Sequence, residues 1–134
     1  MTSPLERLAG AGQSLVAEPF DQAEFDGLLR AARARLKDSR REANALESRF
    51  DLAYNAAHGL CLAALRRKGF RAKNRYIVFQ VLPETLSLGL EVWRVLAKAH
   101  ELRNLGEYEG ELDIDERFVG ELIEAVSKIS TALG

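Results

Sequence analysis

The chain has 134 residues, of which 47% are hydrophobic and 29% are charged, and its formal net charge is −1. These values are typical of one globular domain that buries about 65–70% of its unfolded surface in a single core. The near-neutral charge excludes a global attraction to nucleic acid or to membranes. A single cysteine, Cys61, excludes an internal disulfide and fits a reducing compartment.

No apolar run approaches the ~18–20 residues that span a bilayer. The N-terminus also lacks the basic region followed by an apolar region that marks a signal peptide. We therefore expect a cytoplasmic protein without a membrane partner.

The first predicted element is a short N-terminal helix. Residues 3–6, Ser-Pro-Leu-Glu, form a capping box with proline at the first helical position, and Gly10 ends the helix. We expect residues 1–20 to form a loosely attached arm with this helix, and residues 21–134 to form the main domain.

Two longer helices follow. Asp21 is the predicted N-cap of the first, with Glu24 three residues later, and apolar residues at helical spacing continue to about residue 42. The second spans 47–68 and has the clearest helical periodicity in the chain, and Gly69 stands where a left-handed C-cap belongs.

The second half of the chain is also predicted to be helical. The short apolar run 76–82, stopped by Pro83, is interpreted as one or two helical turns. A helix then spans 86–105, a loop bracketed by glycines follows at 106–110, and an aspartate, Asp113 or Asp115, caps the last helix. Four amphipathic helices with short connections predict an all-α fold, an antiparallel up-and-down four-helix bundle.

Apolar residues occupy more than one side of the predicted helix 86–105. The inward face is expected to hold Leu90, Trp93 and His100, while valines and leucines also occur elsewhere on its circumference. Because a helix that is apolar over so much of its surface needs cover on both sides, we expect a homodimer.

Several segments together resemble the HEPN family (higher-eukaryote and prokaryote nucleotide-binding helical bundle). They are residues 49–57 (Arg-Phe-Asp-Leu-Ala-Tyr-Asn-Ala-Ala), residues 69–71 (Gly-Phe-Arg), and Arg103-Asn104 followed by Tyr108. The order of the predicted helices is similar to that of the family as well.

The resemblance covers about residues 20–134 and implies an antiparallel helical bundle that is commonly dimeric. Many HEPN members are metal-independent ribonucleases of toxin–antitoxin or defence systems, often encoded beside a minimal nucleotidyltransferase. Others have lost catalysis and serve as binding or assembly modules. The resemblance thus implies RNA or a nucleotidyltransferase as partner, without cofactor or metal.

The family motif is an arginine, a polar residue and then a histidine four to six residues past the arginine. Arg103 and Asn104 match it, whereas Tyr108 stands at the histidine position. Metal-free RNA cleavage needs a base for the 2′-hydroxyl proton and a cation beside the phosphate. A tyrosine with a pKa of ~10 is ionised in about one molecule in a thousand at pH 7, so it is a poor base. Whether the chain is an enzyme stays open.

Two histidines are further candidates. His58 forms a polar line with Asp51 and Asn55 on one helix, which indicates either a site facing Arg103 or a solvated face. His100 follows an arginine by six residues but falls in register with an apolar stripe, which favours a packed histidine of the core or dimer seam.

A basic stretch is the other candidate site. Its six cations lie within ten residues that contain no acid: Arg66, Arg67, Lys68, Arg71, Lys73 and Arg75. Such a group fits RNA phosphates, but it also fits the solvated C-terminus of a helix. The acidic run 107–115 lacks the spacing of a calcium loop, so no metal site is predicted.

Three functions remain open from the sequence. The first is a dimeric HEPN-like module, non-catalytic or weakly catalytic, that binds a protein partner, RNA or both in a toxin–antitoxin or other RNA-related system. The second is a metal-independent endoribonuclease toxin that uses Arg103, Asn104 and Tyr108, with His58 as a further candidate member. The third is a purely structural assembly module.

Overall fold

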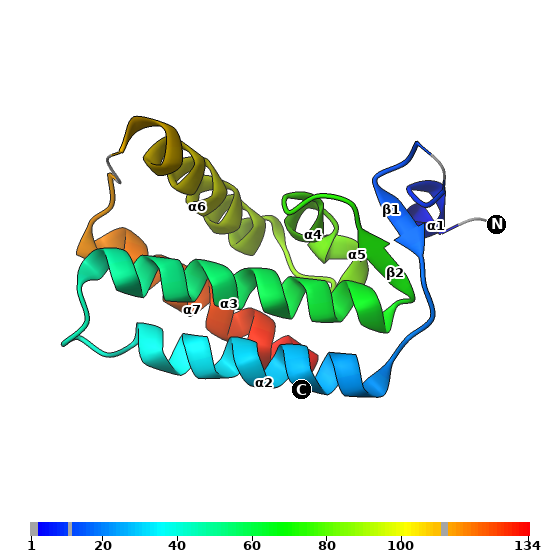
Figure 1. Cartoon of the computed structure of the whole chain (residues 1–134), viewed down its shortest axis with the longest axis horizontal. Coiled ribbons are helices and arrows are strands. Elements are labelled where there is room, and N and C mark those ends of the chain that lie inside the picture. The colour runs from blue at the N-terminus through cyan, green and yellow to red at the C-terminus, as the bar shows by residue number, and fades with distance from the viewer. Residues whose placement is uncertain (1–2, 11, 111–112) are drawn as a thin grey trace.

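The structure, a computed structural model, describes residues 3–10, 12–110 and 113–134, with the side chains of 107–109 also left out. The described part is mainly helical, with one very small sheet (Figure 1). Its elements in chain order are α1 (Pro4–Arg7), β1 (Leu15–Ala17), α2 (Gln22–Ser39), α3 (Leu46–Arg67), β2 (Phe70–Ala72), α4 (Ile77–Gln80), α5 (Leu82–Thr85), α6 (Leu90–Glu109) and α7 (Glu116–Leu133).

Helix α3 is the centre of the fold. Figure 1 shows α2 beside it in the opposite direction, α7 crossing behind the pair, and α6 at an angle above. Gly59 permits the close approach of α2, because a Cβ built there would lie 3.2 Å from the Cβ of Ala32. The apolar stripe predicted for α3 is confirmed as core: Phe50, Ala53, Tyr54, Ala57, Leu60, Cys61, Ala64 and Leu65 are all fully buried.

Helix α7 closes the core from the other side. Of the two candidate caps, Asp115 is the one used, since its carboxylate accepts a hydrogen bond from the Phe118 backbone N–H at 2.8 Å. The apolar residues that recur at helical spacing along α7 are buried: Phe118, Leu122, Ile123, Val126, Ile129 and Leu133.

The N-terminal segment is anchored more firmly than the sequence predicts. Helix α1 is confirmed with its Ser3 cap, but β1 then pairs with β2 in an antiparallel two-stranded sheet, with Val16 opposite Arg71. Leu15 is completely buried beneath this sheet. The expectation of a loose arm was therefore wrong, because three-residue strands are too short to show a periodic pattern.

The short run after β2 is confirmed as helical, in the form of α4 and α5. Helix α6 differs from the prediction at both ends: it begins at Leu90, continues through Gly106, and ends where Gly110 takes a left-handed conformation with φ 74°. The predicted loop at 106–110 was thus wrong. Leu90 was also expected to face inward, but it is 58% exposed. Within the described residues, no helix combines the length and apolarity needed to cross a membrane.

Candidate functional site

A buried tyrosine and a histidine join α3 to α6. Tyr54 is fully buried, and its hydroxyl oxygen lies 2.8 Å from Nδ1 of His100. The other ring nitrogen of His100, Nε2, lies 3.1 Å from the amide nitrogen of Asn104, one helical turn further along α6. Because an amide N–H only donates, Nε2 accepts here and Nδ1–H donates to Tyr54. The imidazole is thus held at both nitrogens.

Two arginines from separate elements gather at the same tyrosine. The guanidinium carbon of Arg103, on α6, lies 5.1 Å from the centroid of the Tyr54 ring, and that of Arg75, before α4, lies 5.9 Å from it. Both distances are typical of cation–π contacts. The ring of Tyr76 stacks on His100 with centroids 4.6 Å apart. We call Tyr54, Arg75, Tyr76, His100, Arg103 and Asn104 the Tyr54 cluster.

The polar line on α3 belongs to this region as well. Burial of His58, together with the charges of Arg75 and Arg103, lowers the pKa of its imidazole from 6.5 to about 4. Desolvation raises the pKa of the Asp51 carboxyl, and the Arg103 guanidinium pulls it in the opposite direction. The charge of Arg103 therefore acts on both His58 and Asp51; Asp51 itself is exposed, whereas Asn55 and His58 are half-buried.

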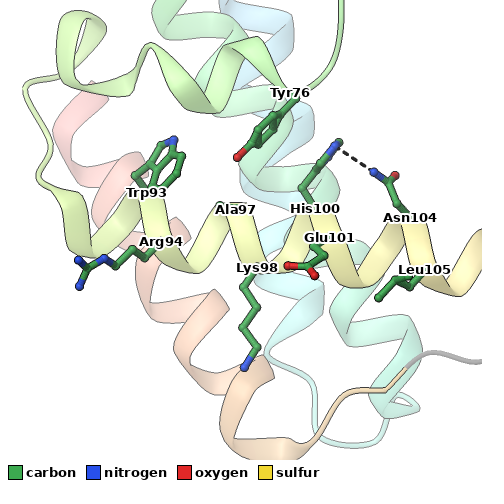
Figure 2. Close-up of a pocket in the computed structure, with 9 residues that line it drawn as sticks. All are labelled: Tyr76, Trp93, Arg94, Ala97, Lys98, His100, Glu101, Asn104 and Leu105. Carbon is green, nitrogen blue, oxygen red and sulfur yellow. Dashed lines mark hydrogen bonds between the residues drawn. The ribbon is translucent and has the colours of Figure 1, made fainter.

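A pocket of about 640 Å³ opens beside the Tyr54 cluster (Figure 2). Tyr76, His100 and Asn104 belong to both the cluster and the pocket wall, and Tyr76 and Trp93 stand on either side of Ala97. The lining residues are Tyr76, Trp93, Arg94, Ala97, Lys98, His100, Glu101, Asn104 and Leu105. Aromatic rings and polar groups thus share one opening.

The basic stretch does not form one surface. The side chain of Arg66 is 2% exposed and ion-paired with Glu18 and Glu24, at 3.3 and 2.6 Å. Arg71 pairs with the same two carboxylates at 2.6 and 2.5 Å. The prediction that Arg66 contacts nucleic acid was therefore wrong, because its guanidinium is enclosed and fully engaged within the protein.

The other cations of the stretch differ from one another in their contacts and exposure. Arg67 lies over the Phe25 ring and donates to the carbonyl of Leu133, while Lys73 donates to the carbonyl of Gly10. Lys68 is exposed just after α3. Of the six, Arg75 is the member of the Tyr54 cluster.

The structure brings Arg103, Asn104 and His58 into one region. Tyr108, the fourth predicted residue, has its backbone in the last turn of α6, and its side chain lies outside the described residues. Two members were not predicted as site residues: Tyr54 entered only as part of the segment 49–57 that resembles the family, and His100 was assigned to a core or dimer seam. The sequence does hold a signal for this pair: both residues lie on apolar stripes, and buried polar atoms on facing stripes need hydrogen-bond partners and frequently pair with each other.

No family model, curated protein or solved structure matches this chain. The function is therefore inferred from the site itself.

Over the parts of the chain that the structure describes, no three His, Cys, Asp or Glu side chains gather as metal ligands. Cys61 is enclosed in the core, and burial raises the pKa of its thiol, so it is no nucleophile. What the cluster can offer is fixed cations and stacking surfaces, with the neutral imidazole of His58 nearby.

Proposed function

We propose that the chain is a HEPN-like helical module that binds RNA through the Tyr54 cluster. The observation that carries this proposal is the convergence of Arg75, from the turn before α4, and Arg103, from α6, on one buried aromatic ring. Guanidinium groups are planar donors that match the oxygens of a phosphate. Aromatic rings beside them suit unpaired RNA bases, which stack on such side chains.

The electrostatics of the region favour an anionic ligand. Arg75 and Arg103 both depress the pKa of His58, which means that their combined positive charge acts on the same volume. Both cations would attract a phosphate placed there. The negative charge of the phosphate would also offset the repulsion between the two arginines and a proton on His58. We infer that RNA is held through its backbone at this point.

Binding fits the geometry better than cleavage. His100 has both ring nitrogens occupied, by Tyr54 and Asn104. His58 is neutral at pH 7, but a pKa of about 4 makes it a weak base, since the best general base titrates near the working pH. The module is therefore proposed to be non-catalytic or only weakly catalytic.

A metal-independent endoribonuclease is the second candidate, favoured by the shared region of His58, Arg103 and Asn104. Purified protein incubated with labelled RNA in EDTA tests it, with Arg103→Ala as the comparison. Cleavage by the wild type that the variant lacks would support the enzyme. Equal absence of cleavage in wild type and variant would refute the enzyme.

A homodimer is part of the proposal, and α6 supports it. Leu90, at the start of α6, is 58% exposed, and a second copy would remove it from water. We further propose an antiparallel four-helix HEPN-like topology built from α2, α3, α6 and α7, since these helices follow the predicted order. The resemblance alone supports a cytoplasmic toxin–antitoxin or RNA-related setting with a nucleotidyltransferase partner.

The binding proposal is tested by retention of single-stranded RNA on filters over a series of salt concentrations. Arg75→Glu and Arg103→Glu should each weaken retention, and each lost phosphate contact should reduce the slope of log affinity against log salt by about 0.7. Arg35→Glu, an exposed arginine on α2, is the matched control and should retain RNA like the wild type. Retention by all three variants at the wild-type level would refute the proposal.

A further inference from the structure

Two aromatic side chains border the pocket beside the Tyr54 cluster. Trp93 and Ala97 lie one turn apart on α6, and Tyr76 approaches from the segment before α4, so that the small alanine lies between the two rings (Figure 2). Tyr76 is held against His100 with an interplanar angle of 20°. We call Tyr76, Trp93 and Ala97 the aromatic slot.

The slot has the size and chemistry of a nucleobase site. The pocket volume of about 640 Å³ lies within the roughly 300–1,000 Å³ of small-ligand pockets. Ala97 leaves room above the helix backbone, whereas a larger side chain at this position would fill it. Asn104 lines the pocket and offers an amide, and Glu101 offers a carboxylate, so polar edges of a flat heteroaromatic ring have partners.

The slot is continuous with the proposed phosphate-binding cations. Arg75 and Tyr76 are neighbours in the chain, and His100 contacts both the hydroxyl of Tyr54 and the ring of Tyr76. A nucleotide whose phosphate lies at the arginines thus has a stacking surface directly beside it. A base inside a duplex is paired and stacked, so only an unpaired one can enter.

Resting on the proposed function, we infer that the aromatic slot takes one unpaired purine base of the bound RNA. A purine is favoured over a pyrimidine because its larger ring system covers more of both aromatic side chains. Base stacking of this kind changes affinity by roughly tenfold to a hundredfold per base.

Trp93 is the only tryptophan of the chain, so its fluorescence reports on the slot. The probes are short oligoadenylate, oligocytidylate of equal length, and the same backbone without bases. Oligoadenylate should quench Trp93 and bind at least about tenfold tighter than the base-free strand, with oligocytidylate in between. Ala97→Leu should abolish the quenching and this preference. Ala34→Leu, the same change on the exposed face of α2, should behave like the wild type.

The outcomes separate this inference from the RNA-binding proposal. Equal, salt-dependent retention of oligoadenylate and the base-free strand, without quenching, would overturn the slot and leave RNA binding intact. Quenching by adenosine monophosphate that Ala97→Leu abolishes, without retention of any oligomer, would support the slot and overturn RNA binding. Trp93 emission that follows protein concentration and ignores nucleotides would assign the slot to a second copy of the chain and refute the inference.

Discussion

Arg66 offers a sharp test of how the site is held in place. Its guanidinium is enclosed by the end of α3, the segment before α2 and β2, and replacing it with alanine removes every one of these links. Besides Glu18 and Glu24, it donates to the backbone carbonyls of Pro19 at 2.6 Å and of Phe70 at 3.2 Å. These contacts fix the strand that leads directly to Arg75.

The expected cost follows from burial. With the side chain of Arg66 only 2% exposed, its removal opens a cavity and leaves backbone carbonyls without a donor, at about 1–3 kcal/mol for each buried group left unsatisfied. That is a large share of the roughly 5–15 kcal/mol that stabilises a domain. Arg71 binds the same two carboxylates but has 39% of its side chain exposed, so Arg71→Ala should cost no more than about 1 kcal/mol.

Urea unfolding followed by circular dichroism measures both free energies in the same buffer. We expect Arg66→Ala to lower the free energy of unfolding by at least about 2 kcal/mol more than Arg71→Ala does. Similar small losses in the two variants would refute the reasoning, because Arg66 would then behave as a solvated surface cation. Arg66 would then again be a candidate for contact with RNA.

Three further predictions concern the Tyr54 cluster, His58 and the proposed dimer. Tyr54→Phe removes the hydroxyl that pairs with His100 while keeping the ring, so the free energy of unfolding should fall by about 1–2 kcal/mol, and an unchanged midpoint in urea would argue against the hydrogen bond. His58 should titrate by NMR near pH 4. Because its pKa is lowered on folding from 6.5, the stability it contributes is complete above pH 6.5 and declines as the pH falls toward 4; titration near 6.5 would contradict the depressed pKa. Leu90→Glu should shift sedimentation at micromolar concentration from dimer to monomer, and a wild-type monomer would disprove the proposed dimer.

The sequence predicts the helices well because their burial is periodic. The stripes of α3 and α7 follow the 3.6-residue repeat, and both are buried as expected. The predicted end of α6 was too early because the sequence alone does not distinguish a glycine inside a helix from a glycine at its C-cap. Of the two glycines, Gly106 is helical and Gly110 takes the left-handed conformation.

The site was harder to predict because its contacts are distant in sequence. Arg103 and Asn104 were identified from a motif, but the hydroxyl of Tyr54 that fixes His100 lies 46 residues away from it. The burial of Arg66 was equally hidden: its carboxylate partner Glu24 lies 42 residues earlier, and a run of basic residues gives no sign of which cation is enclosed.

The chain has two histidines, and both lie in or beside the Tyr54 cluster, so their imidazole signals in a ¹H–¹³C spectrum report on the site directly. Upon addition of single-stranded RNA at neutral pH, the signals of His58 and His100 should both shift in the wild type, and both shifts should be smaller in Arg75→Glu at the same RNA concentration. RNA that is retained by the protein while both histidine signals stay unchanged would place its binding elsewhere and contradict the account.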